Sequence, residues 1–130
     1  MTIDVQAYKE LYIRTALELV IAIETFTEAL QTNPADEHAL SELHRAAHSL
    51  KSQSLVMGYP HTGRLAKHIE VTLRQYKDTS TQPEKELLIL ISSTTEKLKK
   101  NIGLIKDGEH EENLDTAIAA FKVFEKTQID

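Results

Sequence analysis

Apolar residues recur at every third or fourth position through most of this chain, in segments separated by short polar breaks that contain Pro or Gly. Because an α-helix has about 3.6 residues per turn, this spacing predicts amphipathic helices. The first should span residues 4–32 and end at Asn33-Pro34, since proline lacks an amide donor and restricts the preceding residue. The residues expected on its buried face include Tyr8, Leu11, Tyr12, Thr15, Leu19, Ala22, Phe26 and Leu30.

Four further helices follow from the same periodicity. Their expected extents are residues 36–57, residues 60 to about 78, residues 83–107 and residues 111–126. Gly58 suits a left-handed stop after the second helix, and Pro83 suits the first turn of the fourth. The third helix should bury its apolar stripe, with Glu70 and Arg74 on its flank or outer face.

The predicted fold class is all-α, an up-down antiparallel four-helix bundle with an additional C-terminal fifth helix. Short breaks favour antiparallel packing of neighbouring helices. Only 5% of the residues are aromatic, and there are 4 Gly and 3 Pro, a composition that favours helix over sheet. With 130 residues, the chain is expected to form a single domain over residues 1–130.

Composition also excludes several classes of function. The chain has no Cys, which removes disulfides and thiolate chemistry. Its formal net charge of −5 argues against a nucleic-acid partner, because affinity for phosphate backbones requires concentrated Lys and Arg. The longest apolar run, residues 87–91, is too short to cross a bilayer, and we see no targeting segment. We therefore expect a cytoplasmic protein with no membrane partner.

The sequence His48-Ser49-Leu50-Lys51 places an imidazole and an ammonium one helical turn apart. His48 lies well away from the apolar seam of its helix, beside the small residues Ser41 and Ser52, so the ring should be accessible. An accessible neutral imidazole can attack a phosphoryl group, and Lys51 can pair with the phosphoryl oxygens. This pattern indicates phosphate chemistry.

The segment resembles the signature of histidine phosphotransfer (HPt) domains, most of all the N-terminal phosphoacceptor domain of chemotaxis-type histidine kinases. His48, Leu50, Lys51 and Gly58 match, whereas Ser52 stands where most of the family has Gly. The resemblance implies a role in two-component signalling, in which Nε2 of His48 accepts phosphoryl from a kinase domain and passes it to a receiver-domain aspartate. It implies no independent catalytic activity and no cofactor in this domain, with ATP bound by a separate kinase domain if one is present.

The same resemblance gives Glu70 the role of orienting the ring, by accepting the Nδ1 proton of His48. A second histidine found in these kinases is replaced here by Lys67, with His68 beside it. The expected partners are a receiver domain and the ATP-binding domain of a histidine kinase, and the isolated domain is expected to be monomeric. The residues predicted to contact these partners are Ser41, His44, Arg45, Ser52, Leu55 and Lys67.

Three alternatives stay open at this point. The domain could be a free-standing phosphorelay intermediate that accepts from a receiver aspartate. His44 and His48 could form a zinc pair, completed by His61, His68 or Glu70. A helical adaptor without phosphorylation would belong to a third class.

Overall fold

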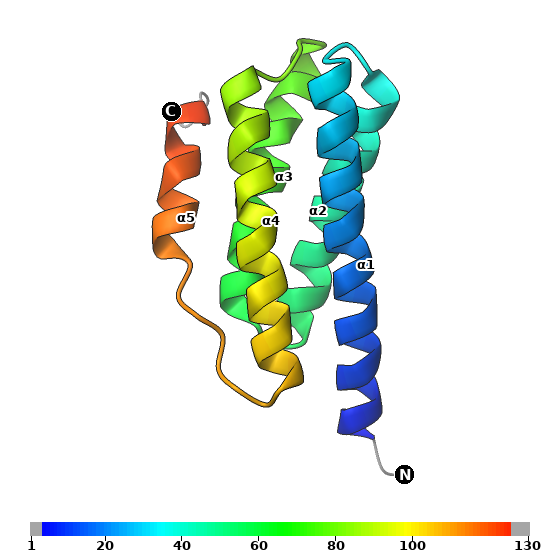
Figure 1. Cartoon of the computed structure of the whole chain (residues 1–130), viewed down its shortest axis with the longest axis vertical. Helices are drawn as coiled ribbons and strands as arrows, with labels where there is room; N and C mark the ends of the chain where they lie inside the picture. The colour runs from blue at the N-terminus through cyan, green and yellow to red at the C-terminus, as the bar shows by residue number, and fades with distance from the viewer. Residues whose placement is uncertain (1–3, 126–130) are drawn as a thin grey trace.

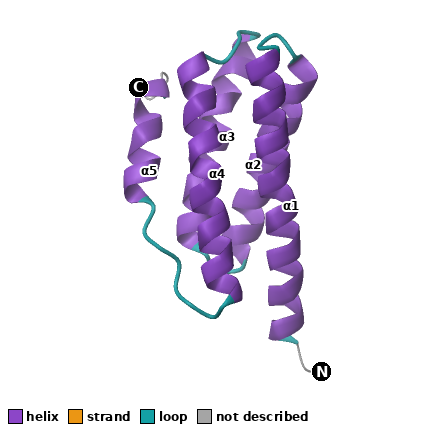
Figure 2. Cartoon of the chain, in the orientation of Figure 1, coloured by secondary structure: helices purple, strands orange, loops and turns teal. Residues whose placement is uncertain are grey.

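The computed structural model describes residues 4–125, and it contains four long helices and one short one (Figure 1). They are α1 (Val5–Thr32), α2 (Glu37–Val56), α3 (Pro60–Thr79), α4 (Lys85–Lys106) and α5 (Asp115–Ala120), followed by a 3-10 turn, η1 (Phe121–Phe124). No strand occurs among the described residues (Figure 2). The prediction of an all-α antiparallel four-helix bundle with an added C-terminal helix is confirmed.

Local chemistry sets the ends of the helices. The carboxylates of Asp4 and Asp36 accept hydrogen bonds from the backbone amides of Ala7 and Ala39, at 3.0 and 2.9 Å, and so cap α1 and α2. Gly58 has φ +84°, the left-handed conformation predicted for the residue that stops α2.

The start of α4 differs from the prediction. Pro83 lies before the helix, Glu84 takes the N-cap position, and the helix begins at Lys85. Proline is compatible with the first turn of a helix, but it does not determine at which residue the helix starts. A difference of two residues at a helix end is therefore small.

One apolar core runs through the bundle, built from the facing stripes of α1, α2, α3 and α4. Its largest fully buried side chains include Ile23, Leu43, Leu50, Leu65, Ile69, Leu73, Leu87, Ile91 and Leu98. Tyr8 and Leu11 were expected on the buried face, but they are 58% and 51% exposed. Both residues lie in the first turns of α1, the end that extends past the other helices (Figure 1), and they line an open groove instead of the core.

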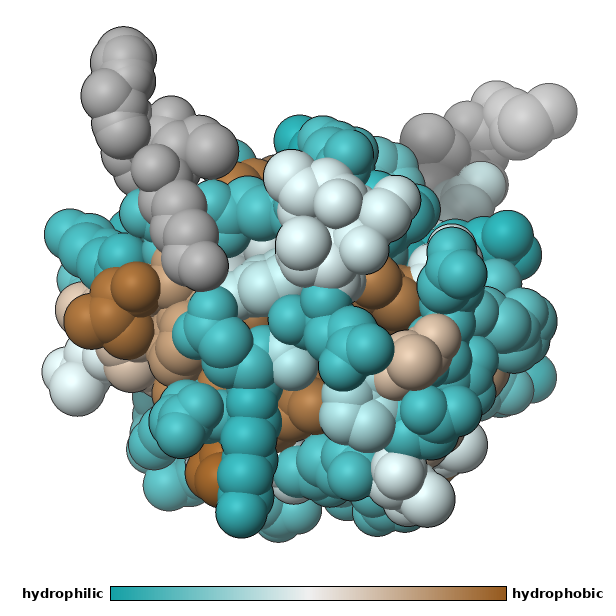
Figure 3. All heavy atoms as spheres, turned by 90° about the horizontal axis from the view of Figure 1, so that it is seen from above, coloured by the Kyte–Doolittle hydropathy of each residue, from teal (hydrophilic) through white to brown (hydrophobic). Residues whose placement is uncertain are grey.

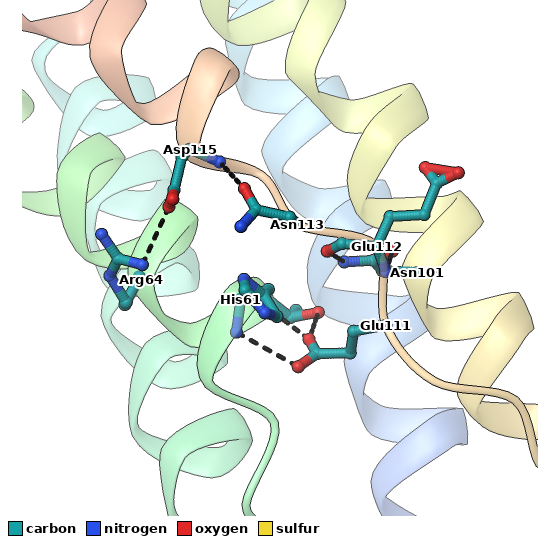
Figure 4. A network of polar contacts seen from close by, with 8 residues as sticks. His61, Arg64, Asn101, Glu111, Glu112, Asn113 and Asp115 are labelled. Atoms are coloured by element: carbon teal, nitrogen blue, oxygen red, sulfur yellow. Dashed lines mark hydrogen bonds and ion pairs between the residues drawn. The ribbon is translucent and has the colours of Figure 1, made fainter.

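The fifth helix also begins later than predicted, because residues 111–114 are not helical. The backbone of Glu112 exchanges two hydrogen bonds with the side chain of Asn101, and the side chain of Asn113 accepts from the amide of Asp115 at 2.8 Å (Figure 4). These bonds replace the helical ones, so α5 starts at Asp115. Lys126, the expected end of the helix, lies outside the described residues.

Glu111 ties this irregular segment to the start of α3. Its carboxylate accepts from the backbone amides of His61 and Thr62, at 3.1 and 2.7 Å, and from the Thr62 hydroxyl at 2.6 Å (Figure 4). The first amides of a helix have no partner within it, so Glu111 caps α3 from a distant part of the chain. The contact fixes the α4–α5 connection against the bundle.

The end of the bundle that carries the α1–α2 and α3–α4 connections is mostly hydrophilic, with small hydrophobic areas between polar side chains (Figure 3). None of the helices in the described part of the chain is long and apolar enough to cross a membrane.

Candidate functional site

The site is centred on His48 of α2 and Glu70 of α3. Nδ1 of His48 lies 2.7 Å from Oε2 of Glu70, a hydrogen bond that joins the two helices. The His48 side chain is 53% exposed, whereas that of Glu70 is 1% exposed. One side of the ring is therefore anchored inside the protein while the other faces solvent.

Two permanent cations contact the same carboxylate. Nζ of Lys51 lies 2.8 Å from Oε1 of Glu70 in an ion pair, and its side chain is 23% exposed. The guanidinium of Arg74 donates to Oε2 at 3.0 Å, from a side chain that is 51% exposed. Glu70 thus lies between His48, Lys51 and Arg74, and its charge is compensated inside the protein.

These contacts determine the protonation state of Glu70. Burial raises the pKa of its carboxyl group, but the contacts with Lys51 and His48 lower it by more, so the pKa lies below its ordinary value. Glu70 is consequently ionised at neutral pH and can only accept hydrogen bonds. The proton in the contact with His48 belongs to Nδ1 of the ring.

A proton on Nδ1 leaves Nε2 with its lone pair whenever the ring is neutral. Among the described residues, none donates a hydrogen bond to Nε2. The arrangement presents an oriented nitrogen nucleophile on a half-exposed ring. It can attack an electrophile as large as a phosphoryl group, because the neighbouring Ser52 has a small side chain.

His44, predicted as a partner-contact residue, lies one turn before His48 and is partly buried. Burial lowers the pKa of His44, and the positive charge of Lys77 lowers it further. Its Nε2 atom is buried without a hydrogen-bond partner. Within residues 4–125, no three His, Asp or Glu side chains are grouped so that they could hold a metal ion.

The other predicted contact residues surround His48 along α2 and α3. Arg45, Leu55 and Lys67 are exposed, and Ser41 and Ser52 are half-buried. Arg45 forms an ion pair with Glu42 at 3.3 Å, one turn earlier on α2.

Sequence reasoning missed three features of the site. It placed Glu70 on the flank of its helix, whereas the side chain is buried between α2 and α3. It assigned no role to Arg74, although four residues after Glu70 is a spacing at which helical side chains meet. An apolar groove beside the site, lined by Tyr8, Leu11, Ser52 and Val56, also went unpredicted.

Together the bundle and the site define a class of protein, a helical scaffold that presents one oriented histidine for transfer of a phosphoryl group. The sequence matches the model of the Hpt domain family over residues 8–120, from the first turns of α1 to the last residue of α5. The chain therefore belongs to the Hpt domain family, as its motif predicted. A search of curated proteins found no match. Hpt domains act in phosphotransfer in two-component signalling, in contact with receiver domains and kinases.

Proposed function

We propose that Nε2 of His48 accepts a phosphoryl group from ATP held by the kinase domain of a histidine kinase. The observation that carries this proposal is the 2.7 Å contact between Nδ1 and Glu70, combined with the exposure of the opposite side of the ring. The Nε2 lone pair attacks the γ-phosphorus, an N–P bond forms, and the bond to the bridging oxygen breaks as ADP leaves.

The phosphorylated ring keeps its Nδ1 proton and therefore carries a positive charge. The Glu70 carboxylate, held next to that proton, stabilises this charge without taking the proton. A receiver aspartate then attacks the phosphorus, the N–P bond breaks, and the imidazole returns to its neutral form. Glu70 thus orients the ring in both steps.

Lys51 would stabilise the phosphoryl group. Its ammonium lies 2.8 Å from Oε1 of Glu70 in an ion pair. A dianionic phosphoryl group on Nε2, one turn away, offers Lys51 a second and more highly charged partner. We propose that Lys51 moves toward those oxygens when His48 is phosphorylated.

The receiver is proposed to dock on the predicted contact residues and on the apolar groove between α1 and α2. Ser52 lines this groove and lies one turn from His48, so the groove continues directly from the reactive ring. Val56 and Tyr8, 85% and 58% exposed, give the groove an apolar rim of the kind that protein partners cover. A receiver whose aspartate reaches Nε2 extends over this rim.

The finer assignments are part of the same proposal. The domain serves a chemotaxis-type kinase in the cytoplasm, is monomeric when isolated, and has no cofactor of its own. The alternative role of a free-standing phosphorelay intermediate uses the same His48 chemistry, with a receiver aspartyl phosphate as donor.

The test is phosphorylation with phosphoramidate, followed by addition of receiver domains encoded by the same genome. The wild-type chain should acquire a label that is stable in alkali and lost in acid, and should pass it to at least one receiver. His48→Gln should acquire none, whereas His44→Gln and His68→Gln should be labelled. Labelling of His48→Gln at the wild-type level, or failure of every receiver to accept the group, would contradict the proposal.

A further inference from the structure

Arg74 shares one oxygen atom with the reactive ring. Its guanidinium donates to Oε2 of Glu70 at 3.0 Å, and Nδ1 of His48 lies 2.7 Å from the same atom. Arg74 is on α3, one turn after Glu70, and its half-exposed side chain reaches back along the helix to the site. Neither the HPt motif nor the proposed transfer step uses this residue.

The charges around Glu70 suggest how the contact with Arg74 affects His48. A single carboxylate next to an imidazole favours the protonated ring, and a protonated ring has no lone pair with which to attack phosphorus. Lys51 and Arg74 place two permanent positive charges on this one carboxylate. The positive charge placed around Glu70 by these two side chains therefore exceeds the single negative charge of the carboxylate.

The other charged and titratable groups around the ring do not reverse this balance. On α2 they are His44, whose pKa is lowered, and Arg45, which is paired with Glu42. On α3 they are Lys67, in the turn before Glu70, and Lys77, whose charge acts on His44. The carboxylate of Glu42, also on α2, forms an ion pair with Arg45 at 3.3 Å.

We propose that Arg74 is a positioning residue for phosphoryl transfer, which keeps His48 neutral and its Nδ1 proton on the inner side by occupying Oε2 of Glu70. This inference rests on the proposed function, because it assumes that Nε2 of His48 is the nucleophile. A lysine at position 74 keeps the charge, whereas a methionine keeps the length of the side chain and removes the charge.

The experiment measures the initial rate of phosphorylation by phosphoramidate between pH 5.5 and 9 for wild type, Arg74→Met and Arg74→Lys. In this reaction Nε2 attacks phosphorus, the P–N bond of the donor breaks, and ammonia leaves. Arg74→Met should move the half-maximal pH upward by about half a unit or more, since a half-exposed charge is partly screened. Below the midpoint the rate should fall about threefold or more, and at pH 9 it should approach the wild-type rate.

The matched control is Arg64→Met. Arg64 lies on the same helix, and its guanidinium forms an exposed ion pair with Asp115 of α5 at 3.0 Å (Figure 4). Its pH profile should coincide with that of wild type, and Arg74→Lys should restore most of the wild-type profile. Urea unfolding of each variant shows whether the fold is intact.

Two results would overturn the inference, provided that the variant is folded. One is a pH profile of Arg74→Met that superimposes on wild type, and the other is an equal loss of rate at every pH, which a merely structural role would produce. Failure of the proposed function gives a different signature, since His48→Gln would then be labelled like wild type whatever residue 74 is.

Discussion

The side chains of His48 and Glu70 are 22 residues apart in the sequence, and they connect α2 to α3 through a 2.7 Å hydrogen bond between Nδ1 and Oε2. The bond has one end in the interior and one at the surface, because Glu70 is buried and His48 is half-exposed. This geometry separates the nitrogen that anchors the ring from the nitrogen that we propose reacts. The proposed function therefore makes the reactivity of His48 depend on a side chain that is buried.

Removing the Glu70 carboxylate should slow phosphorylation of His48 while the protein stays folded. Glu70→Ala is expected to lower the rate by about tenfold, because the ring then samples the wrong tautomer and other orientations. This loss is smaller than the 10²–10⁴ typical of direct proton transfer, since Glu70 takes no proton. The measurement is the initial rate of labelling with phosphoramidate at neutral pH.

Glu70→Gln and Glu24→Ala are the controls for this prediction. The amide oxygen of Glu70→Gln can still accept from Nδ1, so its rate should lie between those of wild type and Glu70→Ala. Glu24, on α1, pairs with Lys99 of α4 and should be replaceable without a change in rate. A Glu70→Ala rate equal to that of wild type would remove the orienting role.

The lowered pKa of Glu70 also predicts a pH dependence of stability. The pKa of the Glu70 carboxyl group is lower in the folded protein than in the unfolded chain. Such a group stabilises the fold at pH values above its pKa in the unfolded chain. This stabilisation is lost as the pH falls through its pKa in the folded protein. Wild type should therefore lose more free energy of unfolding than Glu70→Gln between pH 7 and pH 3. Urea denaturation at both pH values measures the difference, and equal losses would show that the carboxylate is not held ionised by its neighbours.

Glu111 and Glu112 are adjacent residues of the same type with different expected effects on stability. Glu111→Ala should destabilise the protein by about 1–2 kcal/mol, because it leaves the first amides of α3 without their partner. Glu112→Ala should cost about 0.5 kcal/mol or less, since its side chain forms only an exposed ion pair with Lys100. Urea unfolding compares the two, and similar values for both would contradict the capping role of Glu111.

The sequence predicted the bundle and the exposed position of His48 because both depend on local patterns. Apolar spacing and proline breaks define the four long helices, and the angular position of His48 on its helix predicted its exposure. Lys51 was placed correctly one turn from the ring, but it pairs with Glu70 in this structure. Its predicted contact with a phosphoryl group stays a prediction.

Most of the features that were missed depend on contacts between distant segments. Periodicity assigns Glu70 to the flank of α3, and only the approach of α2 shows that the flank is covered. The late start of α5 depends on Asn101, whose side chain bonds the backbone of Glu112. A pattern read along one helix carries no information on such pairs, so the Glu111 cap was visible only in the structure. Arg74 is different, because its spacing of four residues from Glu70 on the same helix was a signal that the sequence analysis did not use.

The central claim is that Nε2 of His48 is the atom that carries the phosphoryl group, and NMR of the phosphorylated, ¹⁵N-labelled protein tests it most directly. The spectra should show phosphorus bonded to Nε2 of His48, with the Nδ1 proton retained and in a hydrogen bond to Glu70. A phosphoryl group on Nδ1 of this ring, or on any other histidine, would contradict the account.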